Sequence, residues 1–462
     1  MKKLMISLLV VFPLTTFLSF TAPALSELKN DIVKYGASPS KSADENQAAI
    51  QAAINELPAD GGTVYIPSGT FLTKPFKLRS NMTLYLEEGA VIKATTDWRD
   101  YATGNPNNGK EGWLWEDCFI KIPDDSQNVT IDGTGTIDGS NCQNTAYGEN
   151  GHRGPHIFHI LRCTGLTVKN ITIKNPGNYH FRFDYCKNVL FENLRLYRGQ
   201  DGFHSQSSEN VRVINCEIRT PDDNVAGSGN KDWFFENCKF MTNGSAFDFG
   251  CLNLTVQNCY FGGDFDMADC YKGNPKDSTV LWTNSALNRF PKEMQTAFRF
   301  FSPRGRNPKN DAGNWVIKDC TVDQVGIFFA QNRPLLNWQV TQCLKSVSFE
   351  NVHVTNLLPD SPLIGGDYGD KSINFVDFPQ QPQDRQIQVY MNNCSFEYKP
   401  GATGTILVAS DFDRIEIHNS SFSGGVEGRT FIDAKDGNTL ILDNVTGNGG
   451  AINTSNINQL IK

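Results

Sequence analysis

Val168-Lys169-Asn170-Ile171 is the first of five copies of a short pattern: an apolar residue, any residue, Asn, and then an apolar residue or Cys. The other copies are Phe191-Glu192-Asn193-Leu194, Val213-Ile214-Asn215-Cys216, Phe235-Glu236-Asn237-Cys238 and Val256-Gln257-Asn258-Cys259. Their asparagines are 23, 22, 22 and 21 residues apart. Such a period is typical of a solenoid, in which equivalent residues of successive coils lie one above another.

The segments between the asparagines have the composition of short strands. Thr63-Val64-Tyr65-Ile66, Met82 to Leu86 and Ala90-Val91-Ile92 are rich in β-branched and aromatic residues, with Gly, Asn or Asp between them. A β-α-β unit needs roughly 30 residues and a helix, and the repeat is shorter and shows no helical period. Several short strands per coil therefore predict a parallel β-helix.

One helix is predicted, over residues 42–56. Ser42 and Glu45 have the spacing of a capping box, and Ala49, Ile50 and Ala53 follow the helical period. We expect this helix to cover the N-terminal end of the solenoid, where an unpaired strand edge invites aggregation.

The pattern returns in the second half of the chain, at Asn351, Asn393, Asn419 and Asn444. The 42 residues from Asn351 to Asn393 correspond to about two coils, and the next spacings are 26 and 25 residues. Two irregular stretches, Trp98 to Cys118 and Gly262 to Gln295, interrupt the period. Such insertions emerge from a solenoid as loops, often around the binding face. Residues 25–462 are therefore expected to form a single β-helix domain.

The first 24 residues resemble a secretory signal. Lys2 and Lys3 precede an apolar run from Leu4 to Phe20, and Ala22-Pro23-Ala24 provides small residues for cleavage. A membrane anchor is the alternative, but Pro13 interrupts the run and no second long apolar stretch follows. We predict that residues 1–24 are removed and that the protein is secreted or periplasmic, without membrane insertion after cleavage.

The balance of charge argues against some partners. The formal net charge is −8 at pH 7, and the predicted signal contributes two lysines and no acid. Nucleic acids and anionic membrane surfaces require a basic face, so neither is expected as a partner. The oligomeric state stays open.

Most of the twelve cysteines are predicted to be free thiols. Four share the repeat position of Ile171 and Leu194, which indicates an inward apolar slot: Cys216, Cys238, Cys259 and Cys394. Four others fit no repeat position and are better candidates for disulfides between loops: Cys118, Cys142, Cys270 and Cys343. No Cys-x-x-Cys or Cys/His zinc spacing is present, and neither a metal nor a cofactor is expected.

Eight residues beyond the first four asparagines lie Asn178, Asp201, Asp223 and Ser245. Asp201 and Asp223 come from neighbouring coils, which lie about 4.8 Å apart in a sheet, and Asp222 adds a third carboxylate. If all three point outward, their repulsion raises one pKa, which suits a reaction that needs a proton donor and a base. Glycoside hydrolysis is such a reaction. The alternative is that these residues only cap turns.

The chain resembles glycoside hydrolase family 28, the polygalacturonases and their relatives, over most of its length. Val33-Lys34-Tyr35-Gly36-Ala37 and residues 61–71 are similar to segments of that family. The family's Asn-Thr-Asp-Gly motif falls on Gly199-Gln200-Asp201-Gly202, and its Asp-Asp motif falls on Asp222-Asp223. The resemblance implies a pectin-lyase-like β-helix, with Asp222 as general acid, Asp201 and Asp223 holding the water, and inversion at the anomeric carbon.

Two family motifs are altered. Gly-His-Gly falls on Gly244-Ser245-Ala246, which lacks the His that supports the acid. Arg-Ile-Lys falls on Arg299-Phe300-Phe301, which keeps the Arg but lacks the Lys. The resemblance implies that this Arg and Lys hold the sugar carboxylate. Arg299 and Ser245 are therefore candidate substrate-binding residues, and the aromatic replacement of Lys suits a neutral or differently decorated sugar.

His180 and His204 are candidates to replace the missing His. His204 follows Asp201 by three residues, and His180 precedes Asp201 by 21 residues, about one coil. Either side chain can serve as a proton partner or donate to a sugar hydroxyl. For each of them the alternative is a packing or capping role.

The sequence thus predicts an all-β, right-handed parallel β-helix with an N-terminal capping helix. Its expected activity is hydrolysis of glycosidic bonds in a polysaccharide or oligosaccharide, pectin-related or differently decorated, and the resemblance implies an α-linked bond. Two alternatives stay open. One is a polysaccharide lyase on the same fold, with Ca²⁺ held by the clustered carboxylates and Arg299 as base. The other is a non-catalytic glycan-binding β-helix.

Overall fold

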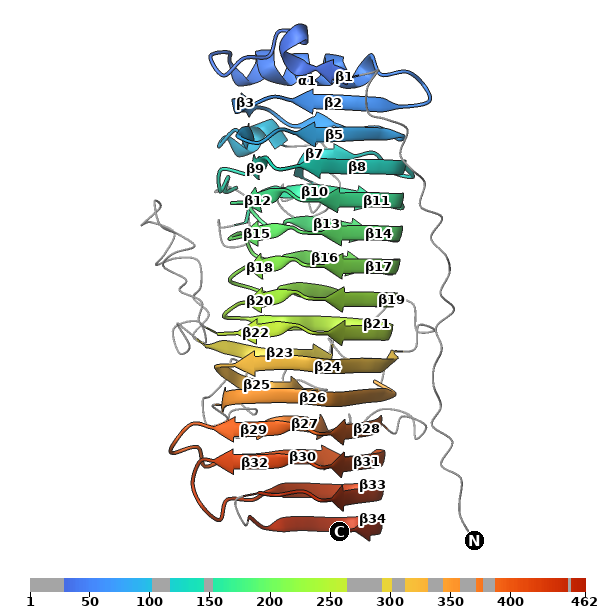
Figure 1. Ribbon diagram of the computed structural model, residues 1–462, viewed down its shortest axis with the longest axis vertical. Coiled ribbons are helices and arrows are strands. Elements are labelled where there is room, and N and C mark those ends of the chain that lie inside the picture. Colours follow the sequence, from blue (N-terminus) through green and yellow to red (C-terminus); the bar gives the residue numbers. More distant parts are fainter. Residues whose placement is uncertain are drawn as a thin grey trace.

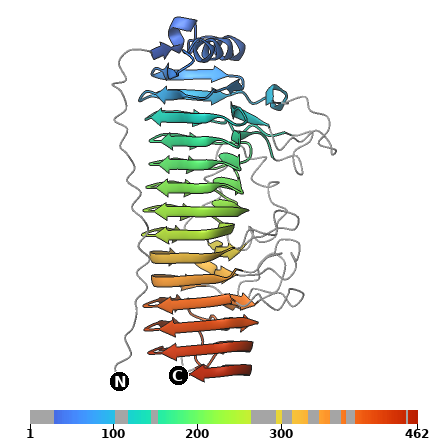
Figure 2. The same ribbon diagram turned by 90° about the vertical axis from the view of Figure 1, so that its right-hand side faces the viewer.

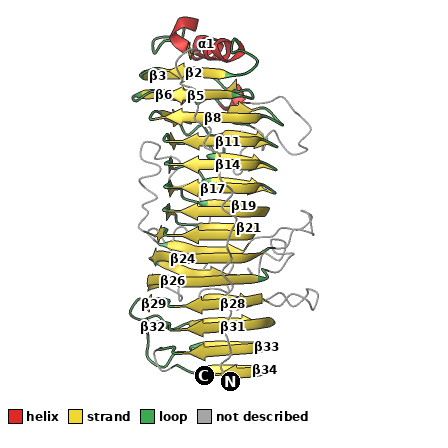
Figure 3. Ribbon diagram, turned by 45° about the vertical axis from the view of Figure 1, so that its right-hand side comes forward, coloured by secondary structure: helices red, strands yellow, loops and turns green. Residues whose placement is uncertain are grey.

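The computed structural model describes residues 29–101, 117–144, 153–263, 293–300, 312–330, 344–357, 371–376, 387–447 and 450–462. These residues form a parallel β-helix, as the period predicts. Strands of successive coils pair in parallel and stack in one column (Figure 1), which is straight when viewed from the side (Figure 2). Strands dominate every coil, and the helical segments lie near the N-terminal end (Figure 3).

The strands follow three rows, and several long strands bend from one row into the next. Row 1 contains β4 (Phe76–Lys77), β7 (Cys118–Ile122), β10 (His156–Leu161), β13 (Phe181–Asp184), β16 (Phe203–Gln206), β19 (Val225–Glu236), β21 (Ser245–Gln257), β23 (Met294–Phe300), β25 (Val325–Ala330), β27 (Lys371–Val376), β30 (Thr405–Ser410) and β33 (Ile432–Asp443). Row 2 contains β1 (Lys29–Asp31), β2 (Gly62–Ile66), β5 (Met82–Leu86), β8 (Gln127–Gly133), β11 (Thr164–Lys169), β14 (Lys187–Glu192), β17 (Glu209–Ile214), the second halves of β19 and β21, β24 (Gly313–Asp323), β26 (Ser346–Leu357), β28 (Ile387–Asn392), β31 (Phe412–His418) and β34 (Ile452–Ile461). Row 3 contains β3 (Gly69–Thr73), β6 (Ala90–Ala94), β9 (Thr136–Asp138), β12 (Thr172–Lys174), β15 (Arg195–Tyr197), β18 (Glu217–Arg219), β20 (Lys239–Met241), β22 (Tyr260–Gly262), the second halves of β24 and β26, β29 (Ser395–Tyr398) and β32 (Ser421–Gly424). The second half of β33 likewise belongs to row 2, where it pairs with β31.

The predicted helix is α1 (Ala43–Asn55), and it lies across the N-terminal end of the stack (Figure 1). Its capping box is complete, because the Ser42 side chain accepts from the Glu45 N–H and the Glu45 carboxylate accepts from the Ser42 N–H. Ala49, Ile50 and Ala53 are buried against the first coils. Short 3-10 turns, η1 (Ile32–Tyr35) and η2 (Trp98–Tyr101), complete the helical segments of the described residues.

The repeated asparagines occupy the turn between rows 2 and 3, and they explain the period of the sequence. All have a positive φ, for example 53° at Asn193 and 55° at Asn215, a conformation that Asn tolerates better than most residues. Their side chains also bond from coil to coil, as in Asn193 Nδ2 to Asn170 Oδ1 at 2.9 Å and Asn237 Nδ2 to Asn215 Oδ1 at 3.1 Å. Each asparagine therefore fixes one turn, and most of them also tie it to the turn before.

One prediction about the coils is wrong. The 42 residues from Asn351 to Asn393 make one coil and not two, because β26 pairs directly with β28. Asn393 Nδ2 also bonds to Asn351 Oδ1 at 3.2 Å, as between neighbouring coils elsewhere. The spacing of the asparagines alone does not distinguish one long coil from two short ones.

The interior is filled by apolar side chains from all three rows. In row 1, Phe158, Phe181 and Phe203 stack with centroid distances of 5.0 and 5.5 Å. The four cysteines of the predicted apolar slot are buried free thiols, namely Cys216, Cys238, Cys259 and Cys394. Of the four predicted to bridge loops, Cys142 is instead a buried free thiol and Cys118 is buried in β7, whereas Cys270 and Cys343 lie outside the described residues.

Within the described part of the chain, no helix is long and apolar enough to cross a membrane. The predicted signal, residues 1–24, lies outside the described residues.

Candidate active site

The three predicted carboxylates lie on the turns that lead from row 3 into row 1. Asp201 lies between β15 and β16, and Asp222 and Asp223 lie between β18 and β19. Phe203 of β16 pairs with Val225 of β19, so Asp201 stands level with Asp223 on the next coil. The spacing of 22 residues therefore places these two side chains one above the other.

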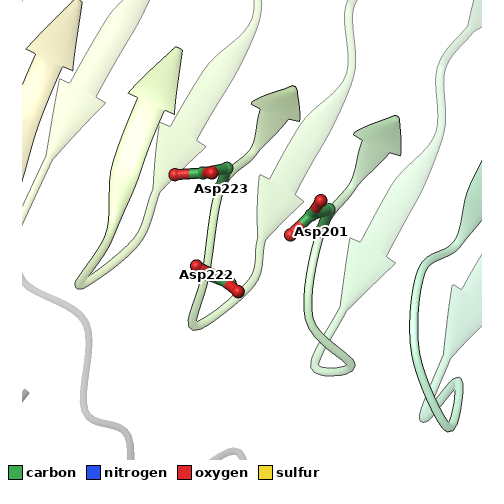
Figure 4. A group of neighbouring side chains, drawn as sticks. All are labelled: Asp201, Asp222 and Asp223. Carbon is green, nitrogen blue, oxygen red and sulfur yellow. The ribbon is translucent and has the colours of Figure 1, made fainter. Parts of the chain in front are cut away.

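The three side chains converge (Figure 4). One carboxylate oxygen of each lies within 4.8 Å of the others. Asp222 joins the group because the chain turns at this point and does not run as a regular strand. The side chain of Asp201 is only 4% exposed, whereas those of Asp222 and Asp223 are 23% and 15% exposed. Asp222 is thus the most accessible carboxylate of the cluster.

Asp201 and Asp223 are held by neighbours that the sequence singled out. His204 Nδ1 lies 2.8 Å from Asp201 Oδ2, on the coil of Asp201 itself. Asp223 Oδ1 accepts from the main-chain N–H of Ser245 at 3.0 Å. Ser245 therefore takes part through its backbone and lies level with Asp223 on the following coil. Asp201 Oδ1 is buried and has no hydrogen-bond partner among the described residues.

Arg299 lies beside the cluster but is paired with another acid. Its Nε donates to Asp248 Oδ1 at 2.6 Å, and its Nη2 donates to Asp248 Oδ2. The same Nη2 lies 3.7 Å from Asp223 Oδ2. Asp248 pairs with Arg299 in register across β21 and β23. Arg299 thus acts as the counter-ion of the buried Asp248 and the partly buried Asp223.

Burial is the largest influence on the pKa values of the three carboxyl groups, and it raises each of them. The pKa of Asp201 rises to about 7, with burial opposed by the positive charge of Arg153. The pKa of Asp222 also rises to about 7, because the charge of Asp201 adds to burial. The pKa of Asp223 rises well above its usual range through burial and the charge of Asp248. The cluster therefore retains protons near neutral pH, where isolated aspartates are ionised.

The two candidate histidines have different surroundings. His204 faces the cluster, whereas His180 is fully buried, with Nδ1 3.1 Å from the Asp201 carbonyl oxygen and Nε2 3.2 Å from the Tyr197 carbonyl oxygen. Burial lowers the pKa of His180 to about 4, so it is neutral at physiological pH. The prediction that His180 contacts substrate is corrected, because the side chain lies under the turn and bonds to the main chain.

The sequence places Asn178, Asp201, Asp223 and Ser245 at equivalent positions of successive coils, and the structure corrects this for Asn178. Phe181 pairs with Phe203, so Tyr179, and not Asn178, stands level with Asp201. The coil before Asp201 contains one residue more than the coils that follow, and this shifts the register. The Tyr179 ring stacks on His204, with centroids 4.6 Å apart and planes 4° from parallel.

Sequence reasoning missed two charged residues of the site, Asp248 and Arg153. Asp248 lies one coil before Arg299, but the long stretch between them hides the repeat that relates them. Arg153 Nη2 lies 3.4 Å from Asp222 Oδ2, although the two residues are 69 positions apart and in no repeat register. Phe301, the residue in place of the family Lys, lies outside the described residues.

Residues 62–253 match the family described as "Glycosyl hydrolases family 28", a segment that includes all three clustered aspartates. A "Probable polygalacturonase" from Vitis vinifera is 27% identical over 198 residues, which cover 39% of this chain and 40% of that protein. The chain spans about half the length of the curated relatives it matches, or less.

Two solved structures share the fold. An exopolygalacturonase from Thermotoga maritima aligns with a TM-score of 0.56 and 15% identity, over 91% of this chain and 92% of that one. A family 28 exopolygalacturonase from Yersinia enterocolitica also aligns with a TM-score of 0.56, at 14% identity, over 94% of this chain and 77% of that one. At these identities the likeness supports the β-helix alone. Over residues 62–253, which include the three clustered aspartates, the chain is therefore similar in sequence to glycosyl hydrolase family 28 and to polygalacturonases.

Proposed function

We propose that this protein is a glycoside hydrolase that cleaves α-linked bonds in a pectin-type polysaccharide or its oligosaccharides. The observation that carries the proposal is the convergence of Asp201, Asp222 and Asp223, with carboxylate oxygens within 4.8 Å of one another. All three side chains project from stacked turns between strands, so their positions are fixed by the backbone of the β-helix. Hydrolysis of a glycosidic bond needs a proton donor and a carboxylate that activates water.

Asp222 is the best placed proton donor. It is the most exposed of the three side chains, and its raised pKa of about 7 leaves it protonated in slightly acidic solution. A glycosidic oxygen that approaches the wall meets this carboxyl group first. Proton transfer from Asp222 lets the bond between the anomeric carbon and that oxygen break, and general acid catalysis of this kind contributes roughly 10²–10⁴-fold to the rate.

Asp201 and Asp223 are placed to hold the attacking water. Their acceptor oxygens are oriented by His204 and by the Ser245 N–H, respectively. Water attacks the anomeric carbon, and one of the two carboxylates takes up the proton that the water loses. Beside Asp223, the positive charge of Arg299 lies near the carboxylates of both Asp223 and Asp248.

The stereochemical outcome is the finest part of the proposal. Family resemblance implies inversion, with a water between donor and base. Carboxyl groups of inverting enzymes are usually about 6.5–9.5 Å apart, and those of retaining enzymes about 5–5.5 Å. Here the value of 4.8 Å is an upper limit on the distances between one oxygen atom of each carboxyl group, so it is not a separation of whole carboxyl groups. We favour inversion because three carboxylates are present, and two of them, Asp201 and Asp223, can share one water.

The substrate class follows from the relatives and from the charges of the site. Arg299 is engaged by Asp248, so it is not a free cation for a sugar carboxylate. We therefore propose a pectin-related glycan whose sugar at this position is neutral or differently decorated from plain galacturonate. The predicted signal at residues 1–24 supports action outside the cytoplasm, where such polysaccharides are met.

The test is a screen of purified protein against a panel of pectin-type glycans, with released reducing ends as the readout. Asp222→Asn removes the proton donor with little change of shape, and we expect a loss of at least about 10²-fold in turnover. Asp232→Asn is the matched control. Asp232 has a φ of 57°, which Asn adopts readily, and its Oδ1 accepts from Asn253, a bond that an amide oxygen can keep. Equal activity of wild type and Asp222→Asn would contradict the assignment of Asp222.

The lyase alternative rests on the same cluster, since three carboxylate oxygens within 4.8 Å are also suitable ligands for Ca²⁺. The buried Asp201 Oδ1 without a partner fits such a role. A lyase leaves an unsaturated, ultraviolet-absorbing product and loses activity with a chelator, and a hydrolase does neither. A non-catalytic glycan-binding β-helix gives a third pattern, in which binding survives in Asp222→Asn and no substrate is turned over.

A further inference from the structure

Arg153 contacts the candidate active site although it is 69 positions from Asp222 in the sequence, and the mechanism proposed above assigns it no role. Its Nη2 donates to Asp222 Oδ2 at 3.4 Å. Its Nη1 donates to the Tyr179 hydroxyl at 3.0 Å and to Asn178 Oδ1 at 3.3 Å. Only 16% of the side chain is exposed, so the guanidinium is held in place. One cation thus joins the carboxylate of the proposed acid to a turn two coils before it.

Tyr179 carries this connection on to the second carboxylate. Its ring lies between His156 and His204, with centroid distances of 4.8 and 4.6 Å. His204 Nδ1 in turn lies 2.8 Å from Asp201 Oδ2. A continuous path of contacts therefore runs from Asp222 through Arg153, Tyr179 and His204 to Asp201.

We propose that Arg153 is a positioning residue of this active site, which holds Asp222 directly and Asp201 through the Tyr179–His204 stack. This inference rests on the proposed hydrolase function. The site lacks the His that the family resemblance expects at Ser245, on the C-terminal side of the aspartates. Arg153 supports the acid from the opposite, N-terminal side.

Arg153 differs from a histidine in what it can do. A guanidinium stays protonated at all relevant pH values, so it does not donate a proton to the reaction. Its fixed positive charge favours the ionised forms of nearby carboxyl groups and lowers the pKa values of both Asp201 and Asp222, against the raising effect of burial. Arg153 thereby limits how far the two pKa values rise, and keeps the cluster able to ionise near neutral pH.

Other charged groups also influence the pKa values of Asp201 and Asp222. Those that face Asp201 and Asp222 from the neighbouring coils are Arg182, Asp223, Asp248 and Arg299. Arg182 is bound to Asp184 at 3.0 Å, and Arg299 is bound to Asp248, so both of these cations already have a carboxylate partner on their own side. Among the residues that the structure describes, Arg153 is the cation that bonds to Asp222 itself.

The test compares Arg153→Met, which removes the charge, with Arg153→Lys, which keeps it but loses the planar fork. For Arg153→Met we expect both limbs of the pH profile of kcat/KM to move up by about one pH unit, because an adjacent opposite charge shifts a carboxyl pKa by about 1–3 units. For Arg153→Lys we expect the pH limbs to stay near those of wild type. Its kcat falls about tenfold or more, because an ammonium group on a flexible stem lacks the rigid planar fork that fixes Asp222 relative to Tyr179. KM is expected to stay within about twofold in both variants.

Arg212→Met is the matched control, because Arg212 packs over Phe234 on the outer face of β17 and contacts none of the site residues described. A fall in kcat or in Tm for Arg153→Met without any shift of the pH profile would overturn the proposal and leave a structural role. An increase in KM alone would also overturn it, and would make Arg153 a substrate ligand.

The proposal can be separated from the function on which it rests. If the wild type hydrolyses no glycan, the proposed function fails, and the carboxyl groups can still be titrated by NMR in protein labelled with ¹³C at the aspartate side-chain carboxyl carbon. Signals assigned through Asp222→Asn and Asp201→Asn should titrate at higher pH in Arg153→Met than in wild type. Unchanged titration overturns the proposal whether or not the protein is an enzyme.

Discussion

Arg299 and Asp248 face each other from neighbouring coils, and two hydrogen bonds join the guanidinium to the carboxylate, one of them 2.6 Å long. Both residues are more than nine-tenths buried. The geometry is the two-pronged arrangement that arginine forms with carboxylates. It ties strand β23 to β21 beside Asp223, so the wall behind the candidate site depends on this pair.

The first prediction concerns the stability of that pair. Asp248→Asn leaves a buried guanidinium without its main partner, and we expect the free energy of unfolding to fall by about 3 kcal/mol. Glu209→Gln is the control, because the Glu209–Lys231 ion pair, 2.8 Å long, is exposed and should contribute less than about 1 kcal/mol. Urea unfolding followed by tryptophan fluorescence measures both. If both variants lost the same free energy of unfolding, the buried ion pair would contribute no more to stability than the exposed one.

The second prediction is the dependence of the rate on pH. Asp222 donates a proton only while protonated, and its pKa is raised to about 7, so kcat/KM should fall tenfold per pH unit above about 7. At lower pH the rate should fall again, as the carboxylates that activate water become protonated. The measurement is the initial rate between pH 4 and 9 on the best glycan of the panel. A rate that keeps rising to pH 9 contradicts the assignment of Asp222 as acid.

The third prediction links the same pKa to stability. The pKa of Asp222 is higher in the folded protein than in the unfolded chain, where it is near 3.8. Between these two values the folded state binds more protons, so stability falls as pH rises through the window. Asp222→Asn lacks this titration. The unfolding free energy of wild type minus that of Asp222→Asn should therefore decrease from about pH 4 to about pH 7, by up to about 1.4 kcal/mol per pH unit.

Urea unfolding of both proteins at a series of pH values checks this difference, and Asp232→Asn provides the reference for an Asp to Asn change away from the site. A difference that grows with pH would mean that the Asp222 carboxylate is stabilised in its ionised form. The raised pKa would then be wrong.

The fourth prediction is the configuration of the product. If Asp201 and Asp223 hold the attacking water, the first sugar released from an α-linked substrate should carry the β configuration at its new reducing end. Proton NMR of the anomeric signals during the first minutes, before mutarotation, distinguishes the two forms. Initial release of the α-anomer indicates retention, and would make one of these carboxylates a nucleophile.

Much of the fold was predictable because one backbone constraint repeats. Every coil needs a residue with positive φ at the turn between rows 2 and 3, and Asn there also bonds to the Asn of the next coil, as Asn215 does with Asn237. The period is therefore visible in the sequence, and with it the stacking of Asp201 and Asp223. It failed between Asn351 and Asn393, where 42 residues separate asparagines of neighbouring coils.

Single-residue shifts explain the errors within the site. His180 and Tyr179 are neighbours in sequence, yet His180 lies buried under the turn, whereas Tyr179 stacks on His204 beside the cluster. Neighbouring residues of an extended chain face opposite ways. A shift of one residue in register therefore exchanges the inner and the outer position, and spacing counted from the asparagines is not accurate to one residue.

By itself the sequence determined a coiled β architecture, the end covered by a helix, and a shared patch for three acidic side chains, because these follow from local preferences repeated along the chain. Only the tertiary structure decided which charges accompany that patch. Arg153 reaches it from a segment that is in no repeat register, and Arg299 lies 51 residues beyond Asp248 although their strands pair directly. Electrostatic forces depend on distance in space, so the protonation of Asp201 and Asp222 is set by neighbours that only folding brings together.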